Sequence, residues 1–201
     1  VISHQNLKFT LRLSASKNIG IFPEQEANWR WLSEHIKPGM KILNLFAYTG
    51  AATLICAQAG AEVCHVDASK AAVRWASENA RLSGLEQAPI RWICDDARAF
   101  LKREQKRGKL YDGILLDPPP FGRADSSQFV FKKHILELLE ACQAVLDSQP
   151  KLFLLNSYAM NLGHSSLNKL VQPFFPGQKV ETGYLSIGEL KLSSYARFAD
   201  S

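Results

Sequence analysis

The sequence has no long apolar segment and no secretory signal. No hydrophobic run among its 201 residues approaches the length that crosses a bilayer. The first residues, Val1 to Lys8, are too polar for a signal peptide. These absences argue against a membrane partner. The chain also starts with Val1 rather than Met, so we expect a processed chain or a fragment of a longer protein.

Cysteine is scarce, and its four copies lack the spacing of a metal site. Cys56, Cys64, Cys94 and Cys142 form no C-x-x-C pair and have no histidine at metal-ligand spacing. We therefore expect no bound metal. Cys56 and Cys64 lie in apolar segments, which predicts reduced core residues and a cytoplasmic location.

A strong charge bias is also missing. Lys and Arg number 24 against 19 Asp and Glu, which gives a net charge of +5. This moderate excess is compatible with a nucleic-acid partner but does not identify one. The content of 46% hydrophobic and 21% charged residues is typical of one globular domain with a sizeable core.

Strand-like and helix-like segments alternate along the chain, without repeats. We expect strands over residues 9–13, 41–46, 62–66, 90–93, 111–116, 152–155, 179–187 and 189–198. We expect helices over residues 23–37, 50–59, 69–82, 96–107, 129–146 and 162–174. This order predicts a Rossmann-like, doubly wound α/β fold, with a mostly parallel sheet and an antiparallel C-terminal hairpin. We divide the chain into an N-terminal strand extension, residues 1–22, and a main domain, residues 23–201.

A carboxylate and three prolines follow one predicted central strand. Asp117-Pro118-Pro119-Pro120 and then Phe121 come directly after the apolar run 114–116. Open α/β sheets place their chemistry at such strand ends. Because proline fixes φ and lacks a backbone donor, the loop is expected to stay extended, with carbonyl groups available to a ligand. A rigid strand exit without chemistry is the alternative interpretation of this segment alone.

Three other strand ends carry polar groups. The first ends in Asn44 and continues through Phe46-Ala47-Tyr48-Thr49-Gly50 into a helix of small residues, where a nucleotide-like ligand can meet the helix N-terminus. The dinucleotide pattern G-x-G-x-x-G is absent, so the ligand need not carry phosphates. Asp67 ends the next strand about 20 residues later, where a carboxylate accepts ribose hydroxyls. In the segment Cys94-Asp95-Asp96-Ala97 one acid is expected to cap the next helix, and the other can accept from an adenine amino group.

Parallel strands bring Asn44, Asp67, Asp96 and Asp117 to one edge of the sheet. Carboxylates gathered there are costly unless they bind a ligand with donors or positive charge. S-adenosylmethionine fits this edge, because it offers ribose hydroxyls, an adenine amine, an ammonium group and a sulfonium. An aromatic ring from Phe46, Tyr48 or Phe121 can stack on adenine or face the sulfonium.

These segments resemble class I S-adenosylmethionine-dependent methyltransferases, and among them the enzymes that modify bases of large-subunit ribosomal RNA. The resemblance covers roughly residues 19–200 and rests on residues 20–25, 43–50, 66–69 and 117–121. It implies a seven-stranded sheet, with Asp67 at the ribose and Asp96 near adenine. It further implies the turn 46–50 at the methionine part, and Asp117 with Pro118 and Pro119 at the methyl group and the acceptor. The cofactor-binding residues that we predict are Asn44, Phe46, Ala47, Tyr48, Thr49, Gly50, Asp67, Ala68, Asp96 and Ala97.

The methylated atom stays open at this point. In the related amine methyltransferases an aromatic residue directly follows the two prolines, whereas here Pro120 intervenes before Phe121. In the cytosine-modifying relatives a cysteine nucleophile follows the fifth strand, where Ser157 stands here, so carbon methylation is disfavoured. Asn156, Ser157 and Tyr158 either line the acceptor pocket or form a polar strand end.

Basic side chains beyond the proline loop can reach RNA phosphates. Arg123, Lys132 and Lys133 are the candidates, and we predict that Phe121 and Arg123 bind substrate together with residues 156–158. The sequence therefore predicts an S-adenosylmethionine-dependent methyltransferase that acts on RNA, ribosomal RNA in particular. The rival hypotheses are a small-molecule or protein methyltransferase, and a non-catalytic RNA-binding module that keeps the fold. The oligomeric state stays open.

Overall fold

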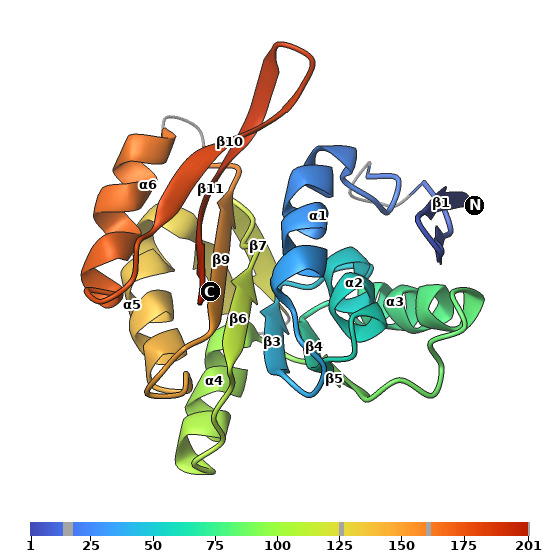
Figure 1. The fold of residues 1–201 in the computed structure, drawn as a ribbon, viewed down its shortest axis with the longest axis horizontal. Helices are drawn as coiled ribbons and strands as arrows, with labels where there is room; N and C mark the ends of the chain where they lie inside the picture. The colour runs from blue at the N-terminus through green and yellow to red at the C-terminus, as the bar shows by residue number, and fades with distance from the viewer. Residues whose placement is uncertain (14–17, 125–126, 160–161, 201) are drawn as a thin grey trace.

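A seven-stranded, mostly parallel sheet forms the centre of the protein (Figure 1). The computed structural model describes residues 1–13, 18–124, 127–159 and 162–200. The strand order is β10-β11-β9-β6-β3-β4-β5. Strand β11 runs antiparallel to β9 and to β10, and the pairs β9-β6, β6-β3, β3-β4 and β4-β5 are parallel. The strands are β3 (Lys41–Leu45), β4 (Glu62–Asp67), β5 (Ile90–Cys94), β6 (Gly113–Leu116), β9 (Leu152–Ser157), β10 (Glu181–Ile187) and β11 (Leu190–Ala199). The predicted fold class is confirmed.

Helices cover both faces of this sheet. In Figure 1, α1, α2 and α3 lie on one side of the strands and α4, α5 and α6 on the other. Their bounds are α1 (Glu26–His35), α2 (Ala51–Gln58), α3 (Lys70–Leu82), α4 (Ala97–Lys106), α5 (Phe131–Gln143) and α6 (His164–Val171). The 3-10 turns η1 (Pro23–Gln25) and η2 (Gln172–Phe174) precede α1 and follow α6.

The central strands divide their apolar side chains between two hydrophobic clusters. Along β6, Ile114 and Leu116 join the cluster under α4, α5 and α6, while Leu115 joins the cluster under α1 and α2. Successive side chains of a strand point to opposite faces, so a strand covered on both sides needs a continuous apolar run. For this reason residues 114–116 are all apolar and buried, and the first polar residue after them is Asp117.

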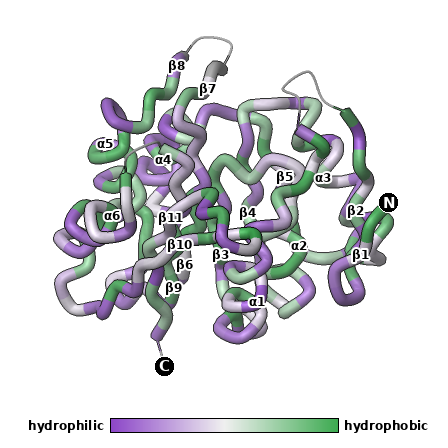
Figure 2. The backbone as a smooth tube through the Cα atoms, turned by 90° about the horizontal axis from the view of Figure 1, so that it is seen from above, coloured by the Kyte–Doolittle hydropathy of each residue, from purple (hydrophilic) through white to green (hydrophobic). Residues whose placement is uncertain are grey.

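Two small hairpins differ from the sequence expectations. Strands β1 (Ile2–His4) and β2 (Leu7–Phe9) pair near the N-terminus, and β7 (Phe121–Ala124) pairs with β8 (Ser127–Val130) after the proline loop. Seen from above in Figure 2, β7 and β8 lie beside α5 and at the far side from β1 and β2. The strand predicted over residues 9–13 is wrong, because the pairing ends at Phe9. The helix predicted from Phe129 begins only at Phe131, because Phe129 belongs to β8.

Helix length sets a limit on membrane insertion. Among the described residues, no helix is both long and apolar enough to cross a membrane.

The division of the chain at residue 22 stays a prediction. Strand β2 packs on α3, where Lys8 N donates to Ser83 Oγ at 2.9 Å and Thr10 N to Asn79 Oδ1 at 3.0 Å.

Candidate functional site

The carboxyl ends of four parallel strands meet at one edge of the sheet. The pairing register places Leu45 of β3 beside Val66 of β4 and Leu116 of β6, and Asp67 beside Cys94 of β5. The residues that follow these strands therefore emerge together. This is the position at which open α/β sheets bind ligands.

The loop between β3 and α2 adopts an unusual backbone. Phe46 and Tyr48 have φ values of 57° and 47°, in the left-handed region that non-glycine residues rarely occupy. Gly50 follows with φ of 88°, and a Cβ atom added there would lie 2.9 Å from the Cβ of Ala76. Strained conformations of this kind persist where surrounding contacts hold them, and they cluster at ligand sites.

Asp67 supplies the contacts that hold this loop. Its Oδ2 accepts from the backbone N of Tyr48 at 2.9 Å, and its Oδ1 accepts from the backbone N of Ser69 at 2.8 Å. Burial raises the pKa of Asp67, although these two backbone donors counteract the shift. Helix α3 does not need the carboxylate as a cap, because the Ser69 hydroxyl accepts from Ala72 N. Each oxygen of Asp67 keeps a further acceptor position for a ligand.

A buried polar chain lies beneath the same loop. Asn44 Nδ2 donates to Thr53 Oγ1 at 2.9 Å, and Thr53 Oγ1 lies 2.9 Å from His65 Nδ1. Burial lowers the pKa of His65 to about 3, so the imidazole is neutral at physiological pH. Asn44 is 3% exposed, and the contact of its amide nitrogen with Thr53 ties β3 to α2.

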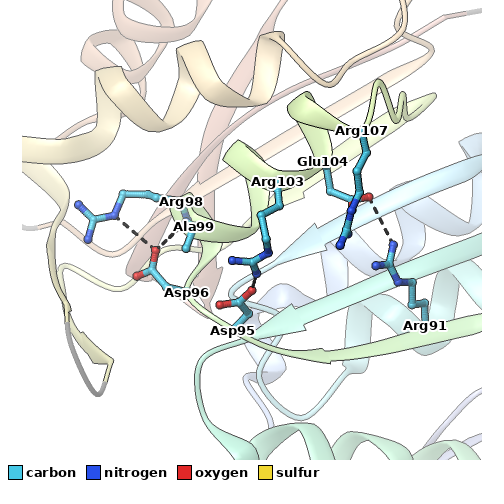
Figure 3. Close-up of polar contacts among 8 residues, drawn as sticks. All are labelled: Arg91, Asp95, Asp96, Arg98, Ala99, Arg103, Glu104 and Arg107. Atoms are coloured by element: carbon cyan, nitrogen blue, oxygen red, sulfur yellow. Dashed lines mark hydrogen bonds and ion pairs between the residues drawn. The ribbon is translucent and has the colours of Figure 1, made fainter.

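The two acids after β5 have different partners (Figure 3). Asp96 caps α4, because its Oδ1 accepts from Arg98 N at 3.0 Å and from Ala99 N at 3.1 Å. Asp95, which precedes the helix, forms an ion pair with Arg103 on the second turn of α4. The sequence predicted that one acid would cap the helix and that the other could accept from adenine. The structure identifies Asp96, the residue predicted near adenine, as the cap, so both assignments fall on the same side chain.

Asp117 lies at the centre of a hydrogen-bonded cluster. Asn156 Nδ2 of β9 donates to Asp117 Oδ1 at 2.8 Å, and Gln25 Nε2 lies 3.4 Å from Asp117 Oδ2. Gln25 Nε2 also donates to the Tyr158 hydroxyl at 3.2 Å, and that hydroxyl donates to Glu24 Oε1 at 2.9 Å. Burial raises the pKa of Asp117 to about 6; the Asn156 hydrogen bond counteracts this rise and the Glu24 charge adds to it.

Two adjoining cavities open at this edge. The larger, of about 1170 Å³ including its open mouth, lies over the ends of β4, β5 and β6, and the smaller, of about 580 Å³, lies between the β3–α2 loop and α1. Phe22, Phe46, Tyr48 and Asp117 line both. The larger cavity holds, among the predicted residues, Asp67, Ala68, Asp96, Ala97, Pro119 and Tyr158. The smaller cavity holds Asn44, Ala47, Thr49, Gly50 and Asn156.

Four predicted residues do not contribute described side chains to these cavities. Pro118 is buried, and Phe121 is 59% exposed on β7, where Gly122 lines the cavity instead. Ser157 is 2% exposed, and its Oγ accepts from Ala159 N. The side chain of Arg123 lies outside the described part of the chain. The sequence predicted that the carbonyl groups of this loop would be available to a ligand. The Pro120 carbonyl is not, because it accepts from Phe131 N at 3.1 Å.

Sequence reasoning missed several residues of the cavity walls, and three of them contact predicted site residues. Phe22 stands between Tyr48 and Tyr158, with ring centroids 5.8 and 5.9 Å away. Phe129 of β8 lies 5.2 Å from the Phe46 ring and takes the wall position expected of Phe121. Gln25, the third, is 7% exposed and reaches Asp117 from η1. Residues 20–25 belong to the segments that resemble the methyltransferase family, so the sequence did point to the region of Phe22 and Gln25. It did not indicate which of these side chains face the site.

The strand order, the acidic edge and the strained first loop define a Rossmann-like methyltransferase fold. A family model described as S-adenosylmethionine-dependent methyltransferase matches residues 1–157. The chain belongs to this family.

Solved and curated proteins agree with this assignment. A crystal structure of the SAM-dependent methyltransferase from Agrobacterium tumefaciens has 40% identity and a TM-score of 0.92, over 98% of this chain and 69% of that one. Ribosomal RNA large subunit methyltransferase K/L of Syntrophotalea carbinolica is 36% identical over 61% of this chain and 17% of its own length. Ribosomal RNA large subunit methyltransferase I of Aeromonas salmonicida is 29% identical over 73% of this chain and 35% of its own length. The chain thus spans between 17% and 35% of the length of these two curated relatives.

The cavity chemistry fits the cofactor of the family. Asp67 offers acceptors for ribose hydroxyls, and Asp117 adds a second carboxylate to the wall of the larger cavity, which suits a cationic ligand. Asp95 and Asp96 on the same wall form ion pairs with Arg103 and Arg98. The buried Tyr48 hydroxyl has no hydrogen-bond partner among the described residues. A buried hydroxyl without a partner is costly, and a polar ligand group would relieve this cost. In the described ranges, no group of three or more His, Cys, Asp or Glu side chains could hold a metal ion.

Proposed function

We propose that the protein is an S-adenosylmethionine-dependent methyltransferase that modifies a base of RNA, in particular of large-subunit ribosomal RNA, in the cytoplasm. The observation that carries the enzyme class is the family match together with the acidic edge formed by Asp67, Asp96 and Asp117. The names of the ribosomal RNA relatives support the substrate.

For the cofactor, we assign roles by position. Asp67 accepts from the ribose hydroxyls, while the wall formed by Ala68, Asp96 and Ala97 faces adenine. The turn from Phe46 to Gly50 holds the methionine part, with the N-terminal amides of α2 directed at its carboxylate. When bound, S-adenosylmethionine supplies an electrophilic methyl group on a sulfonium.

For the acceptor, Asp117 and the carbonyl groups of the Pro118-Pro119 segment accept hydrogen bonds from the incoming base. Asn156 fixes one carboxylate oxygen of Asp117, so the other oxygen is left for the acceptor and for Gln25. Tyr158 and Phe22 form an aromatic wall beside it, against which a planar base can stack. Methyl transfer is an in-line displacement, so the main work of these residues is alignment and exclusion of water.

Carbon methylation through a covalent intermediate has little support in the site. Ser157 is buried and engaged with Ala159 N, and Cys56, Cys64 and Cys142 are buried in the core. The exposed Cys94 ends β5, where its Sγ lies 3.6 Å from Ala68 O, and it does not line either cavity. Burial raises the pKa of Cys64 to about 11, which disfavours a thiolate. The site therefore supports direct transfer to a nucleophilic atom of the base.

The decisive experiment is methylation of total RNA with radiolabelled S-adenosylmethionine, followed by nucleoside mass spectrometry. We expect label in one modified nucleoside, and loss of label with Asp117→Ala while cofactor affinity stays near wild type. Cofactor binding without RNA labelling would contradict the RNA assignment and favour a small-molecule or protein acceptor. Absence of cofactor binding in calorimetry would instead favour the non-catalytic module.

A further inference from the structure

Two buried side-chain amides, those of Gln25 and Asn28, connect Asp117 to Arg197 on β11. Gln25 Nε2 faces Asp117 Oδ2 and the Tyr158 hydroxyl, at 3.4 and 3.2 Å. Gln25 Oε1 accepts from Asn28 Nδ2 at 2.8 Å. Asn28 Oδ1 in turn accepts from Arg197 Nη1 of β11 at 3.3 Å. Asn28 is 1% exposed, so water has little access to its amide.

Arg197 is itself held on several sides. Its guanidinium lies 4.8 Å from the Trp31 ring centroid and 4.4 Å from that of Tyr195. Its Nη2 and Nε contact Glu181 at 3.0 and 3.4 Å. The side chain is 11% exposed. Such stacking and pairing fix the direction in which the guanidinium presents its remaining donor to Asn28.

The direction of every amide in this row follows from the arginine. A guanidinium only donates, so Asn28 must turn its oxygen toward Arg197 and its nitrogen toward Gln25. Gln25 must then turn its oxygen toward Asn28 and its nitrogen toward Asp117. The reversed Gln25 amide would place a carbonyl oxygen against a carboxylate, with no proton between them.

We propose that Arg197, Asn28 and Gln25 form an orienting relay through which the C-terminal hairpin keeps a donor directed at Asp117. Arg197 and Asn28 are positioning residues, because they act on Asp117 only through the Gln25 amide. This inference rests on the proposed function, because it takes Asp117 to be the carboxylate that binds the acceptor. The titratable groups beside Asp117 are Glu24 and Tyr158, and the Arg197–Glu181 pair lies behind the amides.

The test is a double-mutant cycle read by ¹³C NMR of the Asp117 carboxyl group, with Asp117→Asn identifying its resonance. Gln25→Met and Asn28→Leu, which are both uncharged changes, should each raise the Asp117 pKa by about 0.5 or more, because the carboxylate loses a directed donor. In the Gln25→Met background, Asn28→Leu should add nothing. Arg197→Met should raise the same pKa by more in wild type than in Gln25→Met, where only its direct charge effect remains.

The controls separate orientation from folding. Asn168→Leu, which removes an amide that donates to Val180 O outside the relay, should leave the Asp117 pKa unchanged. If Asn28→Leu does not fold, Asn28→Ser replaces it, since serine is too short to reach Gln25. Equal effects of the Asn28 change in both backgrounds, or none in wild type, would overturn the relay. Coupled pKa values with an unchanged pH profile of RNA methylation would support the relay and contradict the acceptor role of Asp117.

Discussion

Replacing Asp67 by alanine tests the cofactor side of the site most directly. The carboxylate accepts from Tyr48 N and Ser69 N and, in the proposed complex, from the ribose hydroxyls. The alanine variant removes all of these acceptors at once. It leaves buried donors of the loop and of the ligand unpaired, and it releases the strained conformation of Tyr48, which has φ of 47°.

The expected loss can be estimated from these contacts. An unsatisfied buried hydrogen-bonding group costs about 1–3 kcal/mol, which corresponds to about 5- to 150-fold weaker binding of S-adenosylmethionine. Isothermal titration calorimetry of the purified variant measures this change. Circular dichroism shows whether the variant keeps its fold.

Asp147 offers a matched control for the same substitution. Its Oδ1 accepts from Gln149 N, two residues along the chain, just as Asp67 Oδ1 accepts from Ser69 N. Asp147→Ala should therefore cost a similar local turn contact and leave cofactor affinity unchanged. Wild-type affinity in a folded Asp67→Ala variant would refute the ribose assignment.

Three further predictions concern the rest of the site. The pKa of Asp117 is about 6 in the folded protein, and its ordinary value is 3.8. The protonated carboxyl group therefore contributes stability below pH 4, and this stability is lost as the pH rises through 6, so Asp117→Asn should stabilise the protein by up to about 3 kcal/mol at pH 7 but not at pH 4. Equal gains at both pH values in denaturant titrations would contradict this. Ser157→Ala should keep most RNA methylation activity, and complete loss in a folded variant would reopen covalent catalysis. Gly50→Ala should destabilise the protein by about 1–3 kcal/mol, because a side chain there meets Ala76 at an unfavourable φ; an unchanged melting temperature would argue against that strain.

Local sequence patterns predicted the sheet and its acidic edge well. Apolar runs such as 114–116 identified buried strands, and the helix predicted over residues 69–82 corresponds to α3. The strand predicted at residues 9–13 failed because its alternation has no partner strand there, so Leu11 and Leu13 are 39% and 89% exposed. Phe129 was assigned to a helix because its spacing to later apolar residues is helical, whereas it pairs with Gly122 of β7 in a hairpin and contacts Phe46. Such contacts across the chain are not encoded in local periodicity.

The contacts of Asp117 show the same limit within the site. Gln25 lies 92 residues before Asp117 and 133 before Tyr158, yet it touches both. No spacing rule relates such distant positions, because the fold alone brings η1 to the end of β6.

The segment before α1 is part of the site rather than an extension of it. Phe22 lines both cavities and packs against Tyr48 on the proposed cofactor side and Tyr158 on the proposed acceptor side. Glu24 and Gln25 follow within the same turn and contact Tyr158. A division of the chain at residue 22, which stays a prediction, would separate Phe22 from these neighbours. We therefore favour a functional unit that includes the segment from residue 20 onward, since one short stretch of chain connects the proposed methyl donor side to the proposed acceptor side.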